Sequence, residues 1–303
     1  MGKILVTAAS GHLGRKTLQH LLKRQPASDL VGLARDPEKA ADLAAQGIEI
    51  RKGDYSDYDS LLNAFAGVEK VMLISCAPFT DRNTQHYNVI TAARQAGVRH
   101  IAYTAIIRRE GSDFNLSQTT GPDIFAEHTL MASGLIYTIV RQPAFLETFQ
   151  FQFGDNVYEK GLRVPAGDGK QAPASREDIG EAQAVVLTEE GHDNRIYSLT
   201  GDPAVSYADV AQILSDTRGT PVPLIPVTDE EYIANYVAEG LPEPVARFAL
   251  EWVHGANLGE WGELTGDLER LIGRKPMTTV EFLRDNYPTV VASVEAARGQ
   301  AAG

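Results

Sequence analysis

The first half of the chain alternates between short runs rich in β-branched residues and longer segments with helical periodicity. The strand-like runs are Lys3–Thr7, Asp29–Ala34, Ile48–Arg51, Val71–Ser75, His100–Thr104 and Ile136–Arg141. The helical segments are Leu13–Lys23, Pro37–Gln46, Tyr58–Phe65, Thr84–Ala96 and Pro122–Ser133. Strands that recur every ~20–30 residues with a helix between them form right-handed βαβ units. We therefore predict an α/β fold of the Rossmann type, with a doubly wound parallel sheet.

The regular alternation of strand-like and helical segments ends after Arg141. Residues 161–174 are rich in Gly, Pro and polar residues, which indicates a long connection or a hairpin. The remaining pattern predicts helices at Glu177–Thr188, Tyr207–Ser215, Asp229–Glu239 and Pro244–Val253, and strands at Arg195–Leu199 and Val222–Val227. We predict a Rossmann domain of residues 1–143 plus about 175–203, and a smaller, mostly helical substrate lobe of about 144–174 plus 204–303. The Ala-rich and Gly-rich tail from about Val291 is predicted to be disordered.

Composition limits the partners of the chain. Its formal net charge is −12, and the densest basic clusters are pairs such as Arg108-Arg109, so we predict no nucleic-acid partner. The single cysteine, Cys76, excludes an intrachain disulfide. We find neither a signal-peptide pattern nor the ~18 consecutive apolar residues of a membrane span. These features predict a cytoplasmic protein without a membrane partner.

The most specific motif follows the first strand, where residues 7–14 read Thr-Ala-Ala-Ser-Gly-His-Leu-Gly. A loop between a strand and a helix lets backbone N–H groups bind a pyrophosphate at the helix N-terminus. Gly11 leaves room for the phosphates and Gly14 lets the helix pack closely on the strand. The first motif position is Ala8 instead of glycine, which costs little if its φ stays negative. The weaker alternative is an ordinary turn. The predicted cofactor contacts in this loop are Thr7, Ser10, Gly11, His12, Leu13 and Gly14.

The residue at the end of the second strand selects the cofactor. An acidic residue there binds the ribose 2′-OH of NAD, whereas an arginine accommodates the 2′-phosphate of NADP. This chain has Arg35, followed by Asp36. We predict NADP(H), with weaker binding of NAD(H); the alternative is a solvated surface arginine.

Further candidates lie where later strands end, because ligands bind at the carboxyl edge of an open α/β sheet. Asp54 follows the third strand and is a candidate for the adenine amino group, although a turn aspartate is nearly as good an interpretation. Ser75 and Cys76 end the fourth strand, and the alternative for Cys76 is a small buried filler. Tyr103, near the end of the fifth strand, completes the cofactor contacts predicted along this edge.

Several strings of residues occur together in a specific order and spacing: Arg35–Ala40, Gly53–Tyr55, Ala96–Thr104, Tyr137–Arg141, Ser175–Ile179, Leu187–His192 and Leu271–Arg274. With the glycine loop they resemble the atypical short-chain dehydrogenase/reductase group that contains NmrA-like proteins, and within it the quinone and triphenylmethane dye reductases. The resemblance covers nearly the whole chain. It implies NADP(H) in the cleft of the sheet, with Pro143, Ala144 and Phe145 against the nicotinamide and substrate. The group contains both reductases and redox-sensing regulators, so both functions stay open.

The usual acid of short-chain dehydrogenases is missing. No tyrosine has a lysine four residues later, and the two family positions are Thr119 and Asp123. Hydride transfer to an electron-poor acceptor depends more on proximity than on a strong acid. Asp123 and Thr104 are weak catalytic candidates; the alternatives are a first-turn helix aspartate after Pro122 and a strand-end threonine.

Other site classes are disfavoured. The seven histidines show no paired metal-ligand spacing, so we predict no metal, and no Gly-x-Ser-x-Gly elbow is present. Phe145 and Phe149, with Phe151 and Phe153, either cover a flat substrate or form the seam between the lobes. We predict an NADPH-dependent reductase of a small electron-poor or carbonyl-containing compound, quinone-like or aromatic. The alternative is a non-catalytic NADP-sensing regulator that acts through a protein partner. A homodimer is left open.

Overall fold

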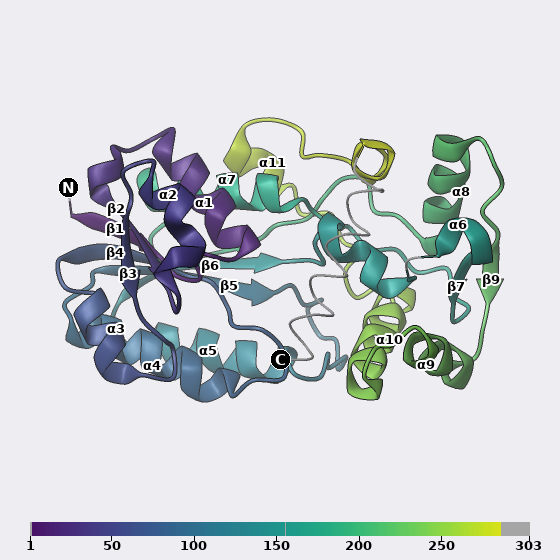
Figure 1. Cartoon of the computed structure of the whole chain (residues 1–303), viewed down its shortest axis with the longest axis horizontal. Helices are drawn as coiled ribbons and strands as arrows, with labels where there is room; N and C mark the ends of the chain where they lie inside the picture. The colour runs from purple at the N-terminus through teal and green to yellow at the C-terminus, as the bar shows by residue number, and fades with distance from the viewer. Residues whose placement is uncertain (1, 155, 286–303) are drawn as a thin grey trace.

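The computed structural model describes residues 2–154 and 156–285, and a seven-stranded parallel sheet forms its first half (Figure 1). The strands are β1 (Lys3–Val6), β2 (Leu30–Ala34), β3 (Glu49–Lys52), β4 (Val68–Leu73), β5 (His100–Ile106), β6 (Ile136–Gln142) and β8 (Arg195–Ser198). They lie in the order β3-β2-β1-β4-β5-β6-β8, and every neighbouring pair is parallel. The order reverses direction between β1 and β4, so the predicted doubly wound fold is confirmed.

Helices cover both faces of this sheet (Figure 1). On one face lie α1 (His12–Leu22), α2 (Ala41–Ala44), α7 (Arg176–Thr188) and α11 (Asp267–Ile272). On the other lie α3 (Tyr58–Ala64), α4 (Arg82–Gln95) and α5 (Thr120–Ala132). Short 3-10 turns occur at Ala27–Asp29 and Pro37–Ala40. Side chains of β1 alternate between the two faces: Ile4 and Val6 join one hydrophobic cluster and Leu5 joins the other.

The second half forms a smaller lobe beyond the carboxyl ends of β5 and β6 (Figure 1). It contains a 3-10 segment at Leu146–Gln152, α6 (Val157–Lys160), β7 (Leu162–Val164), α8 (Tyr207–Arg218), β9 (Leu224–Pro226), α9 (Asp229–Ala238) and α10 (Glu243–Asn257). Its core is rich in aromatic residues, among them the fully buried Tyr207 and Tyr232. Because β7 pairs with β9 in parallel, residues 161–174 do not form a hairpin.

Two local predictions differ from the structure. The expected helix Pro37–Gln46 is divided into a 3-10 turn and α2, because Ala40 leaves helical geometry with φ −121° and ψ 20°. Helix α11 was expected in the substrate lobe, but Leu268 is buried in the core of the first half. Asp267 also accepts a hydrogen bond from the backbone of Ser198, in β8. The rest of the domain division stays a prediction, and the tail from Val291 lies outside the described residues.

No helix in the two described ranges is both long enough and apolar enough to cross a membrane.

Candidate cofactor and substrate site

The glycine loop between β1 and α1 is tightly folded. The backbone N–H of Gly11 donates to the carbonyl of Ala8 at 2.9 Å. A Cβ on Gly14 would lie 2.4 Å from the same carbonyl oxygen, so only glycine fits there. Ala8 has φ +50°, in the left-handed region that glycine normally occupies, so the condition under which alanine would cost little is not met. The chain thus keeps the geometry of the motif at some cost in backbone strain.

The first turn of α1 has no side-chain cap. Gly11 is the N-cap residue, and the first turn contains no acidic side chain, so its backbone N–H groups are available to an anion. Leu13 is buried, so only its backbone faces the loop surface. His12 is exposed, and its pKa is lowered by partial burial and by the nearby Arg176 and Arg15. The positive charge of these two arginines at this end of the loop suits a site that binds phosphate.

Arg35 lies exposed at the end of β2, as the sequence predicts. Its guanidinium makes no hydrogen bond or ion pair with any residue in the described ranges. Asp36 instead accepts the backbone N–H of Glu38 at 3.2 Å and caps the 3-10 turn. Arg35 is therefore free to bind a 2′-phosphate, while the neighbouring carboxylate is occupied.

Thr7 and Tyr55 join the strands on either side of the reversal point. The Thr7 hydroxyl donates to the Met72 carbonyl at 3.1 Å and accepts the Ile74 N–H at 2.9 Å. The Tyr55 hydroxyl bonds to Thr7 and to the Ile74 carbonyl, and burial raises the pKa of this phenol. Sequence reasoning missed this role of Tyr55, for which no local pattern gives a signal.

The side chain of Asp54 accepts the backbone N–H of Ser56 at 2.8 Å, which is the contact of a turn aspartate. Its carboxylate remains half-buried beside the loop that follows β3. Asp54 therefore stabilises its own turn, and contact with the adenine amino group stays a prediction.

The carboxyl ends of β4 and β5 are held together by hydroxyl groups. Ser75 donates its backbone N–H to the Thr104 Oγ1 at 2.8 Å, and Thr104 donates to the Ser75 Oγ at 3.1 Å. Thr104 is fully buried, so its hydroxyl is not exposed at the sheet edge. Cys76 is half-buried, and burial raises the pKa of its thiol, which favours the protonated form.

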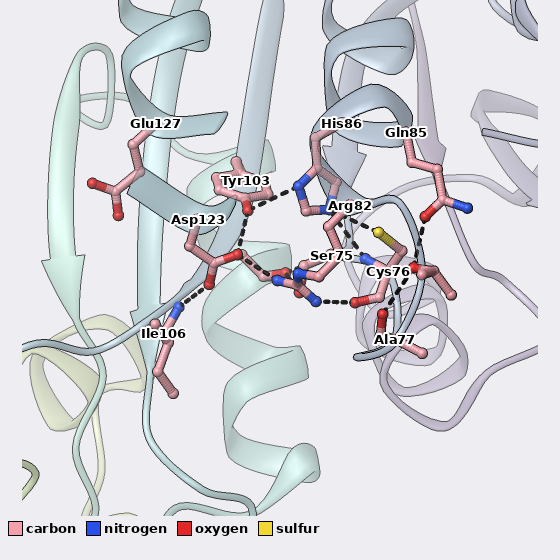
Figure 2. Close-up of polar contacts among 12 residues, drawn as sticks. Ser75, Cys76, Ala77, Arg82, Gln85, His86, Tyr103, Ile106, Asp123 and Glu127 are labelled. Atoms are coloured by element: carbon pink, nitrogen blue, oxygen red, sulfur yellow. Dashed lines mark hydrogen bonds and ion pairs between the residues drawn. The ribbon is translucent and has the colours of Figure 1, made fainter. Parts of the chain in front are cut away.

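Beneath Cys76 lies a buried polar network that draws on α4, β5 and α5 (Figure 2). His86 accepts the Cys76 backbone N–H at Nε2, 3.2 Å away, and its Nδ1 lies 3.4 Å from the Tyr103 hydroxyl. Accepting at Nε2 places the imidazole proton on Nδ1, which then donates to Tyr103. Burial and the nearby Arg82 lower the pKa of His86 to about 3, so the ring is neutral.

Asp123 is the centre of this network. It accepts the Tyr103 hydroxyl at 2.9 Å and the Ile106 backbone N–H at 2.6 Å, and it pairs with Arg82. Arg82 also donates to the Cys76 carbonyl, so Figure 2 shows it between the loop and Asp123. Burial raises the pKa of Asp123, against the influence of Arg82.

The side chains of Tyr103 and Asp123 are both covered by protein atoms. Asp123 is not the ordinary first-turn helix aspartate of the alternative interpretation, because its carboxylate has three partners on two other elements, α4 and β5. These placements support indirect roles for both residues, through the loop at residues 75–77, in place of the direct contacts predicted for them.

The residues after β6 separate into two environments. Pro143 is buried and Phe145 is half-buried, with the Arg176 guanidinium 4.6 Å from its ring centroid. Phe149 has no exposed surface and packs on Phe153 and Tyr207 in the core of the second lobe. The structure thus shows Phe149 as a core residue. Phe145 alone of this pair is partly exposed, beyond the end of β6.

A cavity of about 620 Å³ lies along the flank of α5, lined by Arg108, Arg109, Glu110, Gly111, Ser112, Asp113, Phe114, Asn115, Thr120, Gly121, Ile124, Arg141 and Glu260. None of the residues predicted to bind cofactor or substrate lines it. Arg108 and Arg141 both form paired hydrogen bonds to the buried Glu127, which holds the walls together. We place the chemistry at the sheet edge, because the loop donors and Arg35 lie there.

A family model described as NAD(P)H-binding matches residues 8–190, which include Gly11 and Gly14 of the glycine loop, Arg35 and the whole of α7. The chain belongs to the NAD(P)H-binding family. The predicted nicotinamide dinucleotide cofactor is thereby confirmed.

Relatives of this NAD(P)H-binding protein match it over nearly full length. It is 36% identical to quinone oxidoreductase 2 of Escherichia coli (strain K12) over 279 residues, which are 92% of this chain and 96% of that protein. Its structure matches Citrobacter sp. triphenylmethane reductase complexed with NADP(H), with a TM-score of 0.86, 35% identity and coverage of 93% and 99%. The NADPH-dependent quinone oxidoreductase of Escherichia coli complexed with NADPH gives a TM-score of 0.86, 34% identity and coverage of 96% and 99%. The predicted resemblance to quinone and dye reductases is confirmed.

Proposed function

We propose that this protein is an NADPH-dependent reductase that transfers a hydride to quinones and similar flat, electron-poor acceptors. The observation that carries the proposal is the full-length likeness to two reductases crystallised with NADP(H). The free Arg35 and the uncapped first turn of α1 support it, because both supply unpaired donors at the reversal point of the sheet.

The residues present fit a dinucleotide. The loop of residues 8–14 offers backbone N–H groups to a diphosphate, Arg35 offers two parallel donors to a 2′-phosphate, and Phe145 offers an apolar wall near the end of β6. Bound NADPH supplies the hydride. The chain positions the acceptor, limits the access of water and holds the 75–77 loop through its buried network.

Proton delivery in this proposal comes from solvent. Thr104 and Asp123 are covered and engaged in hydrogen bonds, so neither is placed to protonate an acceptor directly. A reduced quinone oxygen is stabilised by its aromatic ring, so the reaction proceeds without a strong acid in the protein.

The test is steady-state oxidation of NADPH against a panel of quinones, aldehydes and cationic dyes. We expect turnover with quinones or dyes, and less than about tenfold loss of kcat in Thr104→Ala and Asp123→Asn, below the 10²–10⁴-fold contribution of a general acid. Gly11→Val is the control for cofactor binding: a Cβ there would lie 3.2 Å from the Ala8 carbonyl oxygen, and the valine would fill the space of the phosphates, so it should abolish NADPH binding. Binding of NADPH without turnover of any acceptor would instead favour the regulatory alternative.

We also propose a cytoplasmic location, because a chain with a single cysteine cannot form an intrachain disulfide and suits a reducing compartment.

We further propose a homodimer. The dimer is supported by two large exposed side chains, Tyr87 on α4 and Phe125 on α5, which are helices packed against each other. Sedimentation of the wild type and of a Tyr87→Lys/Phe125→Lys variant tests it, and equal monomer masses would contradict it.

A further inference from the structure

Helices α1 and α7 run side by side and in the same direction. Lys16 pairs with Glu177 at 2.7 Å, Thr17 with Gln183 at 2.6 Å and Arg24 with Glu189 at 2.7 Å, so residue numbers rise together along both helices. A Cβ on Gly180 would lie 2.9 Å from that of Lys16, so the backbones approach closely. The N-termini of both helices therefore lie at the edge where the glycine loop is (Figure 1).

Arg176 is the first residue of α7, and its guanidinium lies flat against Phe145. Its backbone N–H donates to the Glu147 carboxylate at 2.9 and 3.2 Å, but its guanidinium has no hydrogen bond or ion pair in the described part of the chain. Other cations nearby are paired: Arg15 with Asp42 and Lys16 with Glu177. The Glu147 carboxylate is the opposite charge near Arg176, but the guanidinium donates no hydrogen bond to it, so the N–H donors of this half-buried side chain are free.

The position of Arg176 relative to the loop follows from its neighbours. Partial burial lowers its pKa, and its charge is one of the causes that lower the pKa of His12 in the glycine loop, so the two residues lie close together. Helix α7 packs over β4, β5 and β6, whereas Arg35 follows β2. The two free arginines therefore lie on opposite sides of the glycine loop.

We infer that Arg176 is a second cofactor-binding arginine, which binds the diphosphate of the dinucleotide from the side opposite Arg35, with its guanidinium held in place by Phe145. The inference rests on the proposed function. A partly desolvated guanidinium whose N–H donors have no hydrogen-bond partner in the described residues is stabilised by an anion, and the diphosphate at the N-terminus of α1 is the anion this edge is built to hold. An anionic group on the acceptor has the same chemistry, and the test separates the two.

The test uses isothermal titration of NADPH, of 2′-phospho-ADP-ribose, which lacks only the nicotinamide, and of 2′-AMP, which has no diphosphate. Arg176→Gln should weaken NADPH and 2′-phospho-ADP-ribose by ~10–100-fold and leave 2′-AMP within twofold. Arg35→Gln should weaken all three, because each carries the 2′-phosphate. Lys16→Gln, which removes a paired cation from the same surface, should leave all three within twofold.

Equal NADPH affinity in Arg176→Gln and wild type would overturn the inference, as would equal weakening of 2′-AMP. A change confined to the KM of the acceptor would place the anion on the acceptor and also overturn it. Thermal melts of each variant confirm folding. Binding does not require turnover, so weakened NADPH in Arg176→Gln together with an inactive wild type would uphold this inference while refuting the reductase.

Discussion

The edge of the sheet has two polar regions, which differ in whether their charged side chains are paired within the protein. Around the glycine loop, the guanidinium groups of Arg35 and Arg176 form no hydrogen bond or ion pair with the described residues, and the first turn of α1 has no side-chain cap. Beneath the ends of β4 and β5, Arg82 and Asp123 are buried and paired with each other. The first region leaves donors for a ligand. The second region pairs most of its donors within the protein, although the Arg82 Nε–H has no hydrogen-bond partner in the described residues.

This difference in pairing indicates that the residues around the glycine loop bind a ligand and that the residues beneath β4 and β5 stabilise the fold. Unpaired donors cost little while they are solvated and become favourable when an anion arrives. A buried ion pair is different, because removal of one charge leaves the other buried without a counter-ion. We therefore expect substitutions in the buried network to change stability, and substitutions around the loop to change cofactor affinity.

The largest effect is expected for Asp123→Asn. The substitution leaves Arg82 charged and buried without a counter-ion, so the free energy of unfolding should fall by ~3–5 kcal/mol. Urea unfolding followed by circular dichroism measures this. Adding Arg82→Met should recover part of the loss, because it removes the stranded charge. Additive losses in the double variant would show that the pair is not coupled.

A pH titration of stability probes the same network. The pKa of His86 is about 3 in the folded protein and that of His100 about 4, both lowered chiefly by burial from a usual value near 6.5. The unfolded chain then binds more protons as pH falls below 6.5, so stability is lost on acidification. For His86 alone the loss is ~2.5 kcal/mol between pH 7 and pH 4.5.

His86→Phe should flatten that slope, and the exposed His128→Gln should not. Parallel pH profiles for wild type and His86→Phe would mean that His86 has the same pKa in the folded and the unfolded protein, against the lowered value.

Structural features that depend on residues close together in the chain could be predicted from the sequence. The βαβ alternation gave the sheet, and the spacing of Gly11, Gly14 and Arg35 gave the loop and the free arginine, because each depends on neighbours a few residues away. The sign of φ at Ala8 could not be predicted, since an alanine there is compatible with either loop conformation until the close packing of Gly14 is known.

Contacts between segments that are far apart in the sequence could not be predicted from the pattern of residues. Arg82, Tyr103 and Asp123 meet from α4, β5 and α5, and the residue next to Asp123, Pro122, suggested an ordinary helix start. Phe149 shows the same limit, because its aromatic spacing fits a substrate wall and a lobe core equally well, and only packing separates them. Placement of α11 likewise depends on its contact with α7 and on Asp267.

Arg35→Ala tests the region around the glycine loop, where the guanidinium donors of Arg35 and Arg176 are unpaired in the described residues. The substitution should reduce the preference for NADPH over NADH by ~1–3 kcal/mol, the scale of a charge-assisted hydrogen bond, with little change in unfolding. Fluorescence titration of both cofactors into wild type and variant measures it, with Lys39→Ala as a nearby exposed control. Equal affinity of the wild type for NADPH and NADH would contradict the role given to Arg35.

The smallest effect concerns strain in the loop itself. At φ +50° an alanine costs ~1–2 kcal/mol relative to the right-handed region, and glycine removes that cost but brings ~0.5–1 kcal/mol of extra chain entropy to lose on folding. Ala8→Gly should therefore raise the free energy of unfolding by a net ~0.5–1 kcal/mol and keep NADPH affinity. Ala9→Gly is the matched control, because Ala9 has no positive φ and is buried against the Gly32 backbone, so this change should destabilise. Equal destabilisation by both substitutions would mean that Ala8 is not strained, and the loop would then owe its shape to Gly14 alone.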